Sequence, residues 1–497
     1  MFYLYRPAIY DGDEGDLLHI RGGRGWDREL WWYKLAHVCQ RWRNLLLGSA
    51  SYLDLCLVCT YGTPVADMLA HSPPLPLIID YSGVDWDIDI TTEDEEEIIL
   101  ALEQRGRVRR IRLEVPLSNL QKLIMAIKDE YPVLEYLIVE RLTEDMSTTL
   151  MLPETLQAPR LRHLGLEGFA LPIGSGFLTT AVGLVTLVLV LRHPSSYFQP
   201  NTLLQWLSIM PHLETLQILF LFPVPNRDVE RQLMQTPIMP HVTLPNLRWL
   251  AFQGVSAYME AIVRRITTPR LERFGIYFFE QLTFSVPRLV QFINAAENLR
   301  FDSLKFQFSN HRVYVKVYSR EEAEMYALQM VIFCLHFDWQ VSSVAQVFNS
   351  LTRISSTVEH LTLEHLTLEH EVHSQSSEEH NEIDYTEWRK LLRSFSKVKT
   401  LRANNGLLLR SLRMDDGELS LELLPELQEL SYSGSGDTID ELKSFIDSRQ
   451  NAGRPVTLVY PRPRSETPLS RSSSSSFSSE SPAITLGSSG AWSDVDT

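Results

Sequence analysis

One six-residue phrase, L-x-x-L-x-L or a close relative, recurs along the chain and constrains its fold more than any other feature. Its instances begin at Val108, Leu134, Leu161, Leu184, Leu213, Leu247, Leu271, Val358, Val398 and Leu427. A proline stands just ahead of six of them: Pro132, Pro159, Pro211, Pro245, Pro269 and Pro425. The last two apolar residues of the phrase are two positions apart, so they lie on one face of a short strand. The first apolar residue anchors the turn that enters the strand.

The spacing of the phrase indicates a repeat. The first six instances are separated by 26, 27, 23, 29 and 34 residues, which straddles the leucine-rich-repeat period of roughly 20–29 residues. Helix-like stretches lie between the phrases: Leu117–Glu130, Thr202–Met210, Ala257–Ile266, Val286–Ala296, Val341–Ile354, Tyr385–Ser394 and Asp437–Ser448. We therefore expect an α/β fold in which residues 106–460 form an irregular leucine-rich-repeat solenoid with parallel strands on its concave face. The rival hypothesis is a conventional α/β domain whose strands and helices alternate by coincidence.

The largest irregularity separates Leu271 from Val358. These two phrases start 87 residues apart, which is about three repeat periods. We expect Phe301–Phe308 to supply one degenerate strand in this interval. Val313–Tyr318 and Tyr326–Leu335 are predicted to form an inserted hairpin.

The region before the repeats divides into two parts. Apolar residues recur every three or four positions in Glu29–Leu47, which predicts one amphipathic helix that ends near Gly48. Residues 51–105 are interpreted as a linker or capping region with strands at Tyr52–Thr60 and Leu77–Tyr81. Cys56 and Cys59 lie in an apolar run of that region, so we expect buried thiols and no metal site.

The predicted helix contains the sequence Leu35-Ala-His-Val38-Cys39-Gln-Arg-Trp42-Arg-Asn-Leu-Leu46. It resembles the second half of an F-box, whose recurring pattern is L-x-x-V-C-x-x-W-R-x-L. An F-box-like helix followed by divergent leucine-rich repeats is similar to a large group of fungal F-box proteins. The L-P-x-E segment that opens an F-box is not recognisable upstream, where Phe2–Tyr5 is its only candidate remnant. We therefore expect a partial F-box-like region over residues 1–50, with its first half missing or degenerate.

This resemblance implies a function. Such proteins are substrate receptors of SCF-type ubiquitin ligases: the F-box binds a Skp-type adaptor that connects it to a cullin, and the repeats hold a target protein. Carried over to this chain, the adaptor-binding residues are Leu35, Val38, Cys39, Trp42 and Leu46. The alternative interpretation of the same apolar stripe is that it packs on the protein's own repeats. The alternative function is a leucine-rich-repeat scaffold for protein–protein interaction without a link to ubiquitin ligation.

Charge and composition exclude several classes. The net charge of −16 disfavours nucleic acid and anionic membranes as partners. No apolar run approaches the ~20 residues that span a bilayer, and Met1–Tyr10 lacks the pattern of a signal peptide. We thus expect a cytoplasmic or nuclear protein. Residues 461–497 are serine-rich and are predicted to be a disordered tail.

The sequence contains no recognisable catalytic motif. H-E-x-x-H, G-x-S-x-G and the glycine-rich phosphate-binding patterns are all missing. A histidine-rich stretch, Glu359–His380, could hold a metal, but its duplicated E-H-L-T-L sequence is better explained as an extended strand phrase. We predict that the chain is not an enzyme and needs no cofactor or metal. Acidic stretches at 85–103, 359–387 and 415–447 either face a basic partner or are solvated.

Overall fold

The computed structural model describes residues 31–50, 52–82, 90–141, 149–171, 176–222, 241–279, 286–320, 325–334, 337–365, 385–403, 412, 423–432 and 439–459. These residues all belong to one compact unit, which ends at Val459. The predicted serine-rich tail, 461–497, lies outside the described residues.

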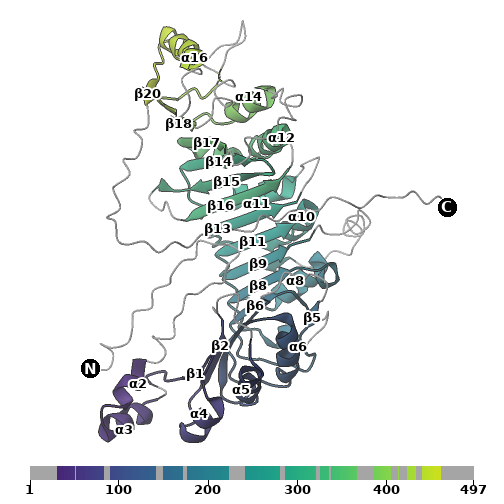
Figure 1. Cartoon of the computed structure of the whole chain (residues 1–497). Coiled ribbons are helices and arrows are strands. Elements are labelled where there is room, and N and C mark those ends of the chain that lie inside the picture. The colour runs from purple at the N-terminus through teal and green to yellow at the C-terminus, as the bar shows by residue number, and fades with distance from the viewer. Residues whose placement is uncertain are drawn as a thin grey trace, which may run out of the picture. The chain divides into compact units, whose positions relative to one another are not determined.

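Among the described residues, sixteen strands form one long sheet (Figure 1). Its spatial order is β1-β2-β3-β4-β6-β8-β9-β11-β13-β16-β15-β14-β17-β18-β19-β20. The strands are β1 Leu57–Cys59, β2 Leu77–Tyr81, β3 Val108–Val115, β4 Tyr136–Arg141, β6 His163–Glu167, β8 Thr186–Leu191, β9 Thr215–Phe220, β11 Trp249–Gly254, β13 Arg273–Phe278, β14 Ser303–Ser309, β15 Arg312–Tyr318, β16 Tyr326–Phe333, β17 His360–His365, β18 Thr400–Ala403, β19 Glu429–Tyr432 and β20 Thr457–Val459. Neighbouring strands are parallel except where β15 pairs with β14 and β16. The mixed α/β class is therefore confirmed, with a sheet that is mostly parallel.

Helices connect the strands and lie along one face of the sheet (Figure 1). They are α4 Val65–His71, α5 Thr92–Leu102, α6 Leu117–Ala126, α7 Gly176–Thr180, α8 Pro200–Ser208, α10 Ser256–Val263, α11 Pro287–Ala295, α12 Phe337–Phe348, α13 Thr352–Thr357, α14 Tyr385–Arg393 and α16 Ile439–Asn451, with the 3-10 turn η2 Pro194–Ser196. Two short parallel pairs complete the described structure: β5 Leu150–Met151 with β7 Phe169–Ala170, and β10 Val242–Thr243 with β12 Ile266–Thr267. The expected helix Val341–Ile354 is two helices, α12 and α13, because the helical conformation is interrupted at residues 349–351.

Each recurring phrase lies in or leads into a strand, and in every phrase except that at Val108, where β3 begins at the leading residue, the strand starts two positions after the leading leucine or valine. The leading residue closes a turn: the N–H of Leu161 donates to the carbonyl of Ala158, and that of Leu247 to Leu244. The prolines ahead of the phrases occupy the second position of these turns, where the fixed φ of proline fits. The leading residues are 2% exposed or less throughout: Leu134, Leu161, Leu184, Leu213, Leu247, Leu271, Val358, Val398 and Leu427.

The second residue of each phrase continues a backbone hydrogen-bond ladder from strand to strand. The N–H of Glu135 donates to the carbonyl of Arg109, and the N–H of Arg162 donates to Glu135, both at 2.8 Å. The same bond, from the N–H of one second residue to the carbonyl of the previous one, continues through Val185, Glu214, Arg248 and Glu272. Several rungs add ion pairs, such as Arg109–Glu135 at 2.9 Å and Lys399–Glu359 at 2.8 Å. Because these charges are partly exposed and screened by solvent, the pairs contribute little; the backbone bonds and the buried leucines set the register.

The interval between Leu271 and Val358 holds a three-stranded antiparallel meander. The expected strand at Phe301–Phe308 is β14, and the expected hairpin is β15 with β16. β14 also pairs antiparallel with β15, and the meander joins the long sheet: β16 lies beside β13, and β14 lies beside β17. The chain thus adds three strands in reversed spatial order without interrupting the sheet.

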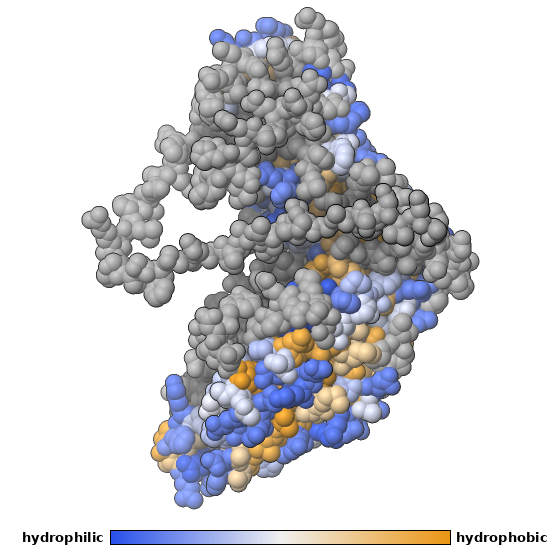
Figure 2. Space-filling model, turned by 45° about the vertical axis from the view of Figure 1, so that its right-hand side comes forward, coloured by the Kyte–Doolittle hydropathy of each residue, from blue (hydrophilic) through white to orange (hydrophobic). Residues whose placement is uncertain are grey.

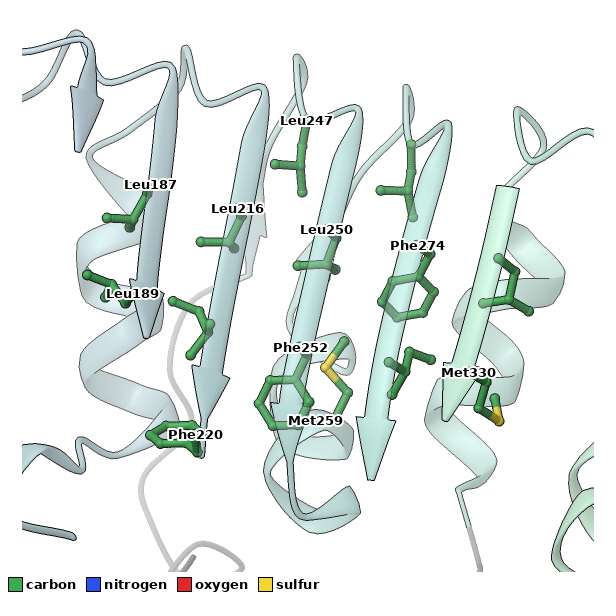
Figure 3. Packing of buried hydrophobic residues seen from close by; sticks show 14 of the residues in the cluster. Leu187, Leu189, Leu216, Phe220, Leu247, Leu250, Phe252, Met259, Phe274 and Met330 are labelled. Carbon is green, nitrogen blue, oxygen red and sulfur yellow. The ribbon is translucent and has the colours of Figure 1, made fainter. Parts of the chain in front are cut away.

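Buried side chains on the helix-facing side of the strands line up in rows across the sheet (Figure 3). Leu187, Leu216, Leu250 and Phe274 form one such row, and each is 3% exposed or less. Burying a side chain of this size stabilises the fold by about 1.5–3 kcal/mol. On the molecular face in Figure 2, hydrophobic residues form short bands between hydrophilic ones.

The phrase at Leu184 is one of four without a preceding proline, and its turn allows a paired test. Val182 occupies the second position of the turn from Ala181 to Leu184 and is 52% exposed. We expect Val182→Pro to raise the free energy of unfolding by about 0.4–1 kcal/mol, because it restricts the unfolded chain. Pro245→Ala, the reverse change in an equivalent turn, should lower it by a similar amount. Urea denaturation of both variants measures this; a destabilising Val182→Pro would contradict the shared turn geometry.

Candidate functional site

Two short helices, α2 (Trp31–Ala36) and α3 (Gln40–Gly48), precede the sheet. The indole Nε1–H of Trp32 donates to the carbonyl of Cys56 at 3.3 Å, which ties α2 to the chain entering β1. Trp32 and Leu46 are both buried, at 4% and 0% exposure, in the same core that runs behind the strands. The helix pair is therefore anchored to the first strands of the sheet.

The expectation of one continuous helix over Glu29–Leu47 was wrong. Cys39 is extended, with φ −163° and ψ 165°, and separates α2 from α3. A straight helix would place Trp32 and Leu46 about 21 Å apart along its axis, so the break allows both side chains to reach the core. The guanidinium Nε–H of Arg43 donates to the carbonyl of Ala36 at 3.2 Å and so satisfies a group at the end of α2.

The break divides the five predicted adaptor-binding residues between two environments. Leu46 is fully buried, and Leu35 is half-buried against the core. Val38 is 59% exposed, Cys39 is exposed and Trp42 is half-buried.

A further apolar residue, Leu45, was absent from the predicted set and is 51% exposed. Its place in the amphipathic stripe was visible in the sequence, but only the bend shows that it lies outside. We call the group Val38, Cys39, Trp42 and Leu45 the α3 surface. Its apolar residues are of the kind that forms the buried centre of protein interfaces.

The second candidate region is the sheet face that points away from the helices, here called the outward face. Alternate strand residues lie on it, because neighbouring residues such as Leu304 and Phe306 point to the helix side and are fully buried. None of the helices described covers this face (Figure 1). An uncovered sheet face with alternating side chains from many strands suits an extended partner.

Histidines on the outward face are paired with threonines of the next strand. His163 Nδ1 lies 3.1 Å from Thr186 Oγ1, and His360 Nδ1 lies 2.8 Å from Thr400 Oγ1. Burial lowers the pKa of His163 below its ordinary value, and the positive charges of Arg162 and Arg110 lower it further. Burial also lowers the pKa of His360. Both rings therefore favour the neutral form near pH 7.

A pocket of about 410 Å³ opens at the N-terminal ends of the neighbouring strands β13 and β16. Its lining comprises Glu272, Arg273, Asn298, Arg300, Ser319, Met325, Tyr326 and Ala327. The guanidinium of Arg273 lies 5.3 Å from the centre of the Trp249 ring. This mixed lining suits a polar or charged side chain better than a large apolar ligand.

The residues considered for metal binding or reactivity have other environments. Cys56 and Cys59 are buried thiols, as the sequence predicted, and burial raises the pKa of Cys59 to about 12. His360 and His365 belong to strand β17, whereas His370, His373 and His380 lie outside the described residues. Within the part of the chain that is described, no group of three or more His, Cys, Asp or Glu residues is placed to hold a metal ion.

None of the described helices has the length and apolar character needed to cross a membrane.

Comparison with known proteins leaves the family open. No protein-family model matches the chain, and no curated protein matches its sequence.

The lowered pKa of His163 predicts a pH dependence of stability. At pH values well above the ordinary pKa of histidine, about 6.5, the ring is neutral in both states. As the pH falls through this value, the unfolded chain takes up the proton first, so the free energy of unfolding decreases until the folded ring is also protonated. We expect His163→Gln to flatten the decrease between about pH 7.5 and 5.5. Urea denaturation at the two pH values tests this; an equal or steeper decrease in the variant would contradict it.

Proposed function

We propose that this chain is the substrate-recognition subunit of an SCF-type ubiquitin ligase. The observation that carries the proposal is the α3 surface: Val38 and Leu45 are more than half exposed on the segment that resembles the V-C-x-x-W-R core of an F-box. Half-buried Trp42 lies between them in sequence. Solvent-exposed apolar side chains beside a tryptophan are suited to bind a partner. In this proposal the partner is a Skp-type adaptor, which links the chain to a cullin.

The sheet is assigned the second half of this function. We interpret the mostly parallel strands, the repeated phrase and the helices on one face as an irregular leucine-rich-repeat solenoid with its outward face concave. That face binds a target protein and holds it near the ubiquitin-loaded enzyme. The chain performs no chemistry itself; it raises the effective concentration of target lysines at another subunit. Such a receptor acts in the cytoplasm or nucleus.

A scaffold without a link to ubiquitin ligation is the alternative function. The burial of Trp32 and Leu46 favours it, because these side chains use the helix pair to cover the core behind the first strands. In that case the α3 surface is incidental to the anchoring of the two helices. Binding to the adaptor separates the two functions.

The test is retention of the full chain on an immobilised Skp-type adaptor from the same organism. We expect the wild type to bind, and Leu45→Asp to weaken binding by about tenfold or more, since it places a charge in an apolar interface. Trp42→Ala should weaken binding as well. The matched control is Met125→Asp on α6, because Met125 is 70% exposed and remote in sequence; it should bind like the wild type.

Thermal unfolding of each variant checks that the fold is intact. Failure of the wild-type chain to bind, or full binding by a folded Leu45→Asp variant, would contradict the receptor function and favour the scaffold.

A further inference from the structure

The outward face carries a local charge opposite to that of the whole chain. Along β13 to β18, its alternating positions include five basic residues and one acidic residue. The basic residues are Arg273, Lys305, Arg312, Lys316 and Arg402, and the acidic residue is Glu364. The protein as a whole has a net charge of −16. This concentration of positive charge, on a face that none of the described helices covers, indicates an acidic ligand.

Lysines from two strands are placed directly opposite each other. Lys305 of β14 and Lys316 of β15 are register partners, and like charges at such positions repel. Lys305 is offset by Glu364, whose carboxylate lies 2.7 Å from its ammonium. Lys316 has the face of Tyr326 at 5.0 Å. Burial lowers the pKa of Lys316, and repulsion by Lys305 lowers it further. An anionic group brought to Lys316 would offset the repulsion by Lys305.

Exposed arginines extend the basic region beyond the lysine pair. Arg402 of β18 is exposed and is aligned with Lys316 through Lys305 and Thr362, three strand spacings away. Three spacings correspond to about 14 Å, which an extended peptide covers in about four residues. Arg312 is also exposed and lies over the ring of Tyr314 at 4.8 Å. The spacing suits acidic side chains at alternate positions of an extended segment.

A buried amide lies beside Lys316. Gln329 is 7% exposed, and its Oε1 has no hydrogen-bond partner. Its register partner on the other side is Gly275, which has no side chain to cover it. A buried acceptor left unpaired costs about 1–3 kcal/mol.

We propose that an extended acidic peptide segment of a partner protein binds across the outward face of β14, β15, β17 and β18, with its carboxylates on Lys316 and Arg402. One of its side chains enters the 410 Å³ pocket, whose wall shares Tyr326 with this region. This inference rests on the proposed function, because it takes the acidic peptide to be part of the target protein that the receptor binds.

The experiment measures binding of a fluorescein-labelled peptide of alternating aspartate and serine to the full chain by fluorescence anisotropy. The comparison peptide has asparagine in place of aspartate. We expect the acidic peptide to bind more tightly, and Lys316→Glu or Arg402→Glu to weaken its binding by about tenfold each. Lys128→Glu, an exposed lysine after α6, is the control and should bind like the wild type. Lys316→Gln and thermal unfolding separate lost charge from lost fold, with the glutamine variant expected to fall between the wild type and Lys316→Glu.

Three outcomes would overturn the inference. The first is equal binding of the aspartate and asparagine peptides. The second is unchanged affinity in folded Lys316→Glu and Arg402→Glu variants. The third is tighter binding of a single-stranded oligothymidylate, with the same sensitivity to both substitutions, which would identify the ligand as a nucleic acid.

Adaptor binding is measured on the same preparations to separate this inference from the proposed function. Retained adaptor binding with no preference for the acidic peptide overturns the inference alone. Retained peptide binding without adaptor binding overturns the receptor function and leaves the basic face as a property of a scaffold.

Discussion

Every strand of this sheet depends on its neighbour for the backbone hydrogen bonds that follow the turn. The leading leucine of each phrase is buried behind the sheet, and the next residue donates its N–H to the equivalent residue of the adjacent strand. A strand without a neighbour would leave these groups unpaired and expose an apolar row. The constraint explains how the chain accommodates the long interval after Leu271. The extra residues form a meander that pairs on both sides, so the ladder resumes between Asp302 and Glu359.

Two surfaces of different chemistry follow from this arrangement. At the N-terminal end of the described chain, burial of Trp32 and Leu46 requires a bend, and the bend directs Val38 and Leu45 to solvent. On the sheet, the meander places Lys305 opposite Lys316 and makes the outward face basic. Under the proposed function, the first surface binds the adaptor and the second binds an acidic segment of the target. A receptor needs two such separate surfaces.

The regular part of the fold could be predicted from sequence because burial imposes a period. The phrases at Leu134, Leu161 and Leu213 each lead into a strand at the same offset, and Leu77–Tyr81 was predicted with its observed bounds. Three features could not be predicted. The first is that β1 and β2 join the same sheet, because the residues near each strand do not determine which strand it pairs with. The break at Cys39 depends on two distant contacts of the core. The basic face escaped prediction because its residues come from separate strands, while the net charge indicated the opposite sign.

Amide hydrogen exchange of the full chain, measured alone and with the Skp-type adaptor, tests the central claim most directly. The account predicts slower exchange on complex formation in peptides covering residues 38–45. It also predicts unchanged exchange in the strands of the meander, because the outward face is reserved for the target. Unchanged exchange in residues 38–45 with protection spread along β14 to β18 would place the adaptor on the sheet and contradict the assignment of the two surfaces.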